Sequence, residues 1–279
     1  MVVKTNGISI NVISEGNSVP AEEIPILFLH GFTGSAKDWP SFFSSLNSKY
    51  FPMAIDLPGH GNTTVPNKSD SFSTEAYTKI IQIVLDHFKI SKVVLVGYSM
   101  GGRTALSFTV KNNEKVVGLI LESSTAGIED EKERSIRMKT DHMLSDKIMT
   151  DGVDSFVNYW MDIPFFRSLK SLGEKEYSKL VLAKKQNSPE GLANSLSGFS
   201  TGKMPSLWSN LSSLTIPTLL IAGSLDRKFG RINTDMDQLL PNSNLEIIND
   251  CGHNTHLENR EEFLILVNNF LSNLENHEA

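Results

Sequence analysis

The chain contains six short apolar runs that are typical of buried β-strands. They show little of the polar and apolar alternation of strands with one exposed face, so both faces of each strand should be covered. The runs are IPILFLH (24–30), FPMAID (51–56), KVVLVG (92–97), VVGLILE (116–122), TIPTLLIAG (215–223) and NLEII (244–248). A seventh segment, residues 7–15, alternates Ile8, Ile10 and Val12 with polar residues and predicts a half-buried strand. Together the runs predict a largely parallel sheet.

Several segments between these predicted strands show the periodicity of an α-helix. Apolar residues recur with i, i+3, i+4 spacing at Tyr77, Ile80, Ile81, Val84, Leu85 and Phe88, and again at Phe263, Leu266, Val267, Phe270 and Leu271. Ser73 or Thr74 can serve as the N-cap of the first helix. Strands alternating with helices predict a doubly wound α/β core with right-handed crossovers.

The alternation stops between the fourth and fifth of the apolar runs. Residues 125–213 contain no β-rich run and instead show charged, helical and aromatic patterns at 130–144, 153–166 and 190–196. We interpret residues 125–213 as an inserted helical cap over the carboxyl edge of the sheet. The predicted α/β core then comprises residues 1–124 and 214–279.

Composition and charge exclude several classes of protein. A length of 279 residues suits one large α/β domain with an insertion, and a net charge of −6 without a basic block argues against nucleic-acid binding. We find no apolar leader and no run long enough to span a bilayer, so no membrane association is expected. The single cysteine, Cys251, fits a reducing compartment. These features predict a soluble, cytoplasmic protein.

The segment Gly97-Tyr98-Ser99-Met100-Gly101 is the first candidate for chemistry. It follows the KVVLVG strand and precedes a helical run that begins near Arg103. In a G-x-S-x-G turn the serine occupies a strained strand-to-helix bend, where larger side chains two positions away would collide. The pentapeptide alone is a weak signal, but its place between a strand and a helix predicts a nucleophile elbow with Ser99 as the nucleophile.

A nucleophilic serine needs a base and an orienting acid. In this architecture the acid follows the serine in the sequence, and the histidine that serves as the base follows the acid. Among the histidines late in the chain, His253 follows a strand and Gly252, whereas His256 is nearer the last helix and His277 lies in a polar tail. We therefore predict His253 as the base and His256 as a solvent-exposed loop residue. Asp226 follows the 215–223 strand and is the predicted acid, with Glu122 and Asp250 as competitors.

A second turn, His30-Gly31-Phe32-Thr33-Gly34, ends the first apolar strand. Its glycines allow backbone amides to face a cavity, so the amides of Phe32 and Met100 are predicted to form an oxyanion hole. The later turn DLPGHG is interpreted as a shaped connection, with His60 in a structural role.

Arg103 narrows the class of substrate. It lies four residues after Ser99 on the predicted helix and hence on the same face, one turn along. A guanidinium binds carboxylates through paired, charge-assisted hydrogen bonds, so this position predicts an acidic substrate. In the cap, Arg137, Trp160 and Lys184 or Lys185 could add cations and an aromatic wall for a polycarboxylated ring.

The motifs HGFTGSAKDW, DLPGHG, VGYSMGG, GSLD and CGHNTHLE together resemble those of the α/β-hydrolase superfamily across essentially the whole chain. Within it, GYSMGGR, the cap stretch through NYWMDIPFF, and GSLDRKF resemble the 2-succinyl-6-hydroxy-2,4-cyclohexadiene-1-carboxylate (SHCHC) synthases, or MenH family.

That resemblance implies a cofactor-independent lyase of menaquinone biosynthesis. It would eliminate pyruvate from 2-succinyl-5-enolpyruvyl-6-hydroxy-3-cyclohexene-1-carboxylate. Ser99, His253 and Asp226 would form the triad, and the carboxylate pocket would be lined by Tyr98, Arg103, Arg137 and Trp160. A third basic side chain of the family falls at Lys184 or Lys185.

Two other interpretations stay open at this point. A carboxylesterase or carbon-carbon bond hydrolase could use the same fold with Ser99 as a true nucleophile. A ligand receptor could retain the fold without catalysis, although all three types of triad residue are present. The expected partner is a small polycarboxylate, and the oligomeric state is left open.

Overall fold

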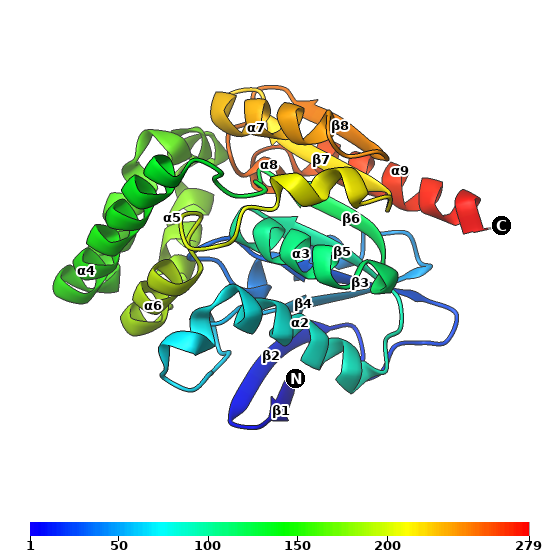
Figure 1. Cartoon of the computed structure of the whole chain (residues 1–279), viewed down its shortest axis with the longest axis horizontal. Helices are drawn as coiled ribbons and strands as arrows, with labels where there is room; N and C mark the ends of the chain where they lie inside the picture. Colours follow the sequence, from blue (N-terminus) through cyan, green and yellow to red (C-terminus); the bar gives the residue numbers. More distant parts are fainter. Residues whose placement is uncertain (279) are drawn as a thin grey trace.

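The computed structural model describes residues 1–278, which form an eight-stranded sheet with helices on both faces (Figure 1). The strand order is β1-β2-β4-β3-β5-β6-β7-β8, and the strands from β3 to β8 are mutually parallel. Their bounds are β1 Val2–Thr5, β2 Ile8–Ser14, β3 Ile24–Leu29, β4 Tyr50–Ile55, β5 Val93–Tyr98, β6 Val116–Glu122, β7 Thr218–Gly223 and β8 Ser243–Ile248. The predicted α/β fold class is confirmed.

The amino-terminal strands form an antiparallel hairpin that the sequence pattern predicted only in part. β1 pairs antiparallel with β2, and β2 pairs antiparallel with β4. Asn6 and Gly7, which connect β1 and β2, both have positive φ angles, of 43° and 79°. An Asn-Gly pair favours such tight hairpin turns, so this dipeptide was the signal for β1 that hydrophobic periodicity did not supply.

The expectation of strands covered on both faces is wrong for β8. This strand forms the edge of the sheet and pairs only with β7 among the described strands, so it is partly exposed along most of its length. Ile247, for example, is 41% exposed. A short apolar run does not by itself distinguish a central strand from an edge strand, because that difference depends on the neighbours that the topology provides.

Nine α-helices complete the described residues. They are α1 Pro40–Phe43, α2 Thr74–Phe88, α3 Met100–Lys111, α4 Glu131–Asp162, α5 Glu174–Lys184, α6 Pro189–Phe199, α7 Arg227–Asp237, α8 Thr255–Glu258 and α9 Arg260–Glu278. Short 3₁₀ helices occur at Ala36–Asp38, Ser69–Phe72, Asn113–Lys115, Pro164–Leu172 and Trp208–Ser213. None of the helices in residues 1–278 is long and apolar enough to cross a membrane.

Two apolar cores lie on opposite faces of the sheet. Side chains of α2, α3 and α7 pack into one core, and those of α1 and α9 pack into the other. Helix α2 begins as predicted, because the Ser73 hydroxyl accepts a hydrogen bond from the Ala76 amide. The carboxyl ends of the parallel strands therefore remain free for a site, as is usual in such sheets.

The segment between β6 and β7 carries α4, α5 and α6, which lie together beyond one end of the sheet (Figure 1). The predicted helical stretches 130–144 and 153–166 belong largely to the one long helix α4, which bends at Gly152, where φ is 77° and ψ is 165°. Helix α5 was not predicted. These helices share a third apolar core, to which Phe32 of the α/β core contributes. The cap boundaries at 124/125 and 213/214 stay a prediction.

Candidate active site

Ser99 lies at a sharp turn between β5 and α3. Its φ of 50° and ψ of −104° are unusual for a residue with a side chain, which is the strain expected of a nucleophile elbow. A Cβ atom on Gly97 would lie 2.5 Å from Gly101, and a Cβ on Gly101 would lie 2.1 Å from the Leu29 carbonyl oxygen. Close packing within the turn therefore requires Gly97, and close packing of the turn against β3 requires Gly101.

Ser99, His253 and Asp226 form a connected hydrogen-bonded chain. His253 Nε2 lies 3.0 Å from Ser99 Oγ, and His253 Nδ1 lies 2.6 Å from Asp226 Oδ2. Asp226 is the N-cap of α7, where its other oxygen accepts a hydrogen bond from the Phe229 amide. In the tautomer that suits this geometry, Nδ1–H donates to the carboxylate and Nε2 accepts from the Ser99 hydroxyl. The tertiary structure thus brings together the three predicted residues.

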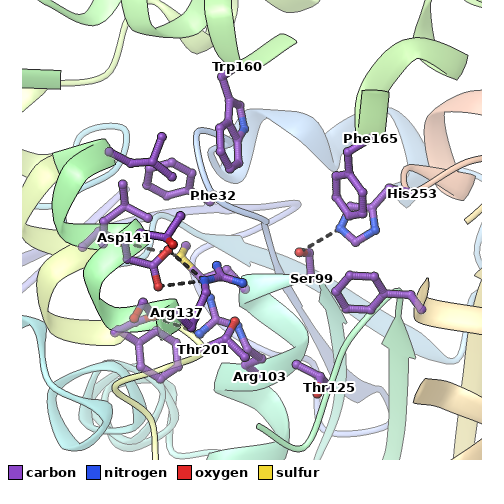
Figure 2. Close-up of a pocket in the computed structure, with 18 of the residues that line it drawn as sticks. Phe32, Ser99, Arg103, Thr125, Arg137, Asp141, Trp160, Phe165, Thr201 and His253 are labelled. Carbon is purple, nitrogen blue, oxygen red and sulfur yellow. Dashed lines mark hydrogen bonds and ion pairs between the residues drawn. The ribbon is translucent and has the colours of Figure 1, made fainter. Parts of the chain in front are cut away.

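The imidazole of His253 lies among aromatic rings. The ring centroids of Phe165, Phe229 and Tyr98 are 4.0, 4.6 and 5.3 Å from that of His253. Figure 2 shows Phe165 beside His253. Burial lowers the pKa of His253 below 6.5, while hydrogen bonding to Asp226 opposes the shift. The imidazole is consequently neutral at pH 7 and available to accept a proton.

The competing acid and histidines occupy other places. Glu122 pairs with His256 rather than with His253, and His256 is only 2% exposed, so the prediction of a solvent-exposed His256 is wrong. Asp250 is exposed in the turn after β8. His277 lies near the end of α9, and its side chain is outside the described residues.

A cavity of about 290 Å³ opens beside Ser99 between the sheet edge and the cap. Its walls combine aromatic rings from both parts with a set of cationic and hydroxyl side chains (Figure 2). Predicted site residues in its lining are Phe32, Tyr98, Ser99, Met100, Arg103, Arg137, Trp160 and His253.

Arg103 is buried in the floor of this cavity. Its Nη1 donates a hydrogen bond to the Phe199 carbonyl oxygen, and its guanidinium carbon lies 4.8 Å from the centre of the Phe199 ring. None of the ion pairs among the described residues includes Arg103. Burial, with a smaller contribution from Arg137, lowers the pKa of Arg103 to about 10. The guanidinium therefore remains charged, and within residues 1–275 it is close enough to Asp141 for that carboxylate to raise its pKa without forming an ion pair.

Arg137 and Trp160 reach the cavity from α4. Arg137 Nε lies 2.8 Å from each carboxylate oxygen of Asp141, one helical turn away. Trp160 packs edge-on against Phe32 with ring centroids 5.6 Å apart, and its indole N–H is buried without a hydrogen-bond partner among the described residues. Both side chains point into the cavity (Figure 2).

The third cation of the cavity is Lys228, which our sequence reasoning missed. It is the second residue of α7, two positions after Asp226, so the GSLDRKF motif was the available signal. Although Lys228 is exposed, its partial desolvation and the nearby Arg137 lower its pKa. The predicted Lys184 is buried at the end of α5 but is not part of the cavity lining, and neither is Lys185. Burial lowers the pKa of Lys184, and the negative charge of Asp38 partly offsets that shift.

Phe32 lies in the turn after β3 and Met100 is the first residue of α3, and both line the cavity together with Ser99. This is the placement expected of two oxyanion-hole amides, and that role stays a prediction. His30 and His60 support the turn. The Leu57 amide donates to His30 Nε2, and the two imidazole centroids are 5.0 Å apart. The structural interpretation of His60 agrees with its complete burial.

Comparisons with known proteins identify the family. Residues 24–260 match the family described as the alpha/beta hydrolase fold. A Bacillus subtilis (strain 168) protein that carries the provisional name SHCHC synthase is 38% identical over 98% of both chains. The SHCHC synthase of Enterobacter sp. (strain 638) is 30% identical over 84% of this chain and 86% of its own.

Solved structures agree with this result. The structure of MenH from S. aureus superimposes with a TM-score of 0.88 at 31% identity, and it covers 95% of this chain and 98% of that one. An enol-lactonase from Burkholderia xenovorans LB400 has a TM-score of 0.84 at 17% identity over 98% of this chain and all of its own, which shows the fold alone. The chain belongs to the α/β-hydrolase family and, within it, to the SHCHC synthases.

Proposed function

We propose that this protein is the lyase of menaquinone biosynthesis that eliminates pyruvate from 2-succinyl-5-enolpyruvyl-6-hydroxy-3-cyclohexene-1-carboxylate. The product is 2-succinyl-6-hydroxy-2,4-cyclohexadiene-1-carboxylate. The observation that carries the proposal is the buried guanidinium of Arg103, which forms no ion pair among the described residues and lies in the same cavity as the Ser99–His253 pair. Such a cation is costly to bury unless a ligand supplies the counter-charge, so the cavity is suited to a carboxylate.

The reaction requires a base and charge stabilisation. His253 accepts the Ser99 hydroxyl proton, and the serine oxygen removes a ring proton next to the succinyl carbonyl. The electron pair of the broken C–H bond delocalises into that carbonyl, whose oxygen would be held by the Phe32 and Met100 amides. As the carbonyl re-forms, electrons shift through the ring and break the carbon–oxygen bond to the enolpyruvyl group. That group leaves as the enolate of pyruvate and takes up a proton.

The cations would position the substrate for this step. The substrate carries succinyl, ring and enolpyruvyl carboxylates, and the cavity offers Arg103, Arg137 and Lys228. Because Arg103 is buried, a charge-assisted hydrogen bond from it to a carboxylate is stronger than in solvent. Trp160 adds a buried indole N–H that lacks a partner among the described residues and can donate to a ligand.

Pyruvate release from the authentic substrate tests the proposal. The wild-type protein is expected to release pyruvate, and Ser99→Ala should lower kcat by about 10²- to 10⁴-fold, the usual contribution of a positioned base. Hydrolysis of p-nitrophenyl acetate, measured in parallel, addresses the esterase alternative. Efficient ester turnover without pyruvate release would show that the protein is a hydrolase of the same fold.

We also propose the cytoplasm as its location. The chain has one cysteine, Cys251, which is buried and free, and this suits a reducing compartment. Fractionation of cells that express the protein, followed by immunodetection, would test this assignment.

A further inference from the structure

A second buried carboxylate–imidazole pair, Glu122 and His256, lies close to the triad. His256 Nδ1 is 2.9 and 2.7 Å from the two carboxylate oxygens of Glu122. Glu122 is fully buried and His256 is 2% exposed. The elimination mechanism assigns neither residue a proton or a charge to carry, so the pair needs another explanation.

Glu122 contacts Ser99 and the segment that follows His253. Its carbonyl oxygen, at the end of β6, accepts a hydrogen bond of 2.8 Å from the Ser99 amide. Its carboxylate accepts hydrogen bonds from the Thr255 hydroxyl at 2.7 Å and from the His256 amide at 3.0 Å. Thr255 and His256 follow His253 by two and three residues. The Glu122 side chain therefore anchors the segment that carries the catalytic imidazole, and the Glu122 backbone anchors Ser99.

The His256 ring extends this anchor to the cavity wall. It stacks on Trp39, with centroids 4.7 Å apart and an interplanar angle of 29°, and meets the Tyr98 ring edge-on at 4.9 Å. Tyr98 in turn lines the cavity and lies 5.3 Å from the His253 ring. A shift of the His256 ring would therefore displace both Tyr98 and the His253 segment.

We propose that Glu122 and His256 are positioning residues that set the distance between Ser99 Oγ and His253 Nε2. The Glu122 carboxylate holds the His253 segment through hydrogen bonds, and the aromatic contacts of His256 fix the orientation of that segment. Transfer of a proton is sensitive to such distances, whereas binding of the substrate carboxylates occurs elsewhere in the cavity. The pair should therefore control kcat more than KM. This inference rests on the proposed function for its kinetic readout.

The hydrogen-bond pattern suggests two informative substitutions at Glu122. Glu122→Gln retains an oxygen that can accept from Thr255 and from the His256 amide, while its NH₂ group can donate to an unprotonated His256 Nδ1. Glu122→Ala removes every side-chain contact. Thr255→Val removes one hydrogen bond at nearly constant volume and serves if the alanine variant does not fold.

Two rates should be measured for each variant. One is the steady-state release of pyruvate, which gives kcat and KM. The other is the labelling of Ser99 by a fluorophosphonate, which reports how well His253 activates the hydroxyl whatever the natural substrate is. For Glu122→Ala, both kcat and the labelling rate should fall by about 10- to 100-fold, the effect of a small misplacement of reacting groups, with KM unchanged.

Glu122→Gln should restore both rates most of the way to the wild-type values, and Thr255→Val should reduce them by a smaller factor than Glu122→Ala. Wild-type rates for Glu122→Ala, or for Thr255→Val where the alanine variant is unfolded, would overturn the proposal. Equal losses for Glu122→Gln and Glu122→Ala would also overturn it, because charge rather than placement would then be responsible. Absence of pyruvate release by the wild-type protein would refute the proposed function, while the labelling series would still test the positioning role.

Asp56→Asn is a matched control. Asp56 is also a buried carboxylate that holds a loop, since it accepts hydrogen bonds from the Ala36 and Asn62 amides at 2.6 and 2.7 Å. It does not contact the His253 segment. The substitution should lower Tm while leaving the labelling rate of Ser99 unchanged, which separates loss of stability from loss of triad geometry.

Discussion

Arg137 and Asp141 form an ion pair in the wall of the cavity, where Nε of the guanidinium lies 2.8 Å from both carboxylate oxygens. Asp141 is 2% exposed, whereas the Arg137 side chain is 33% exposed. This geometry occupies Nε and leaves the terminal nitrogens of Arg137 for another partner. Asp141 therefore orients the guanidinium towards the cavity instead of simply neutralising it.

Replacing Asp141 by asparagine should weaken substrate binding. The amide is a poorer acceptor for Nε than the carboxylate, so Arg137 should lose its fixed orientation. We expect KM for the authentic substrate to rise by about 10-fold, the equivalent of roughly 1.4 kcal/mol, with little change in kcat. Asp151→Asn is the control, because Asp151 forms a similar i, i+4 pair with Lys147 on the exposed side of α4. A lower KM in Asp141→Asn would mean that Asp141 competes with the substrate.

Arg103→Met should make the protein more stable and less active. The buried guanidinium forms no ion pair among the described residues, and methionine can fill much of the same space against Phe199. Replacing a buried charge by an apolar side chain can raise the free energy of unfolding by about 1 to 3 kcal/mol. Loss of the carboxylate contact should lower kcat/KM by about 30- to 1,000-fold.

Thermal denaturation and pyruvate release check these two expectations. Lys111→Met on the same helix is the control, since Lys111 forms an exposed ion pair with Glu75 and such pairs contribute little. An Arg103→Met variant with both lower Tm and wild-type activity would show that the arginine is structural.

The pH dependence of kcat/KM should report His253. Because burial lowers its pKa below 6.5, the acidic limb of the profile should have its midpoint below pH 6.5, with full activity above it. Asp226 raises that pKa, so Asp226→Asn should move the midpoint to still lower pH. The plateau should also fall by about 10⁴-fold, because asparagine favours the wrong imidazole tautomer.

Asp250→Asn is the control for this series. Asp250 lies three residues before His253, is exposed, and has a φ of 57°, which asparagine tolerates. It should leave the profile unchanged. A midpoint that rises in Asp226→Asn would contradict the proposed hydrogen-bonded pair.

Lys228 should contribute to binding rather than to chemistry. It lines the cavity near Arg137, and a point charge there attracts a carboxylate without touching the reacting atoms. Lys228→Gln is expected to raise KM by about 5- to 10-fold and to leave kcat nearly unchanged, as for an interaction made equally in the ground and transition states. Arg227→Gln, at the adjacent exposed position, should have no effect on KM. Equal KM values for the two variants would remove Lys228 from the site.

Local patterns in the sequence were sufficient for most elements of the α/β core. The apolar runs identified β3 to β7 because these parallel strands are covered on both faces, and a further run identified the edge strand β8. The alternation of residues 7–15 identified β2. The elbow around Ser99 was also predictable, since its glycines are required by contacts within a few residues of the turn and with the adjacent strand.

Pairing between distant residues was decided by the tertiary structure. The sequence offered three acids, Glu122, Asp226 and Asp250, and two histidines near the ends of β6, β7 and β8. It favoured Asp226 and His253 for the triad, but only packing decided between the acids and paired Glu122 with His256. The burial of His256 could not be deduced from its position in a polar loop, because the Trp39 ring that covers it comes from more than two hundred residues earlier.

The cations of the cavity illustrate the same limit of prediction from sequence. Arg103 was placed correctly because helical geometry fixes its relation to Ser99 over a single turn. Lys184 was predicted to line the cavity and does not, and Lys228 lines it without having been predicted. The directions of a cap helix and of α7 relative to the cavity depend on long-range packing. Sequence periodicity specifies which face of an element is apolar, but it does not specify which neighbour that face meets, and the composition of a site depends on those neighbours.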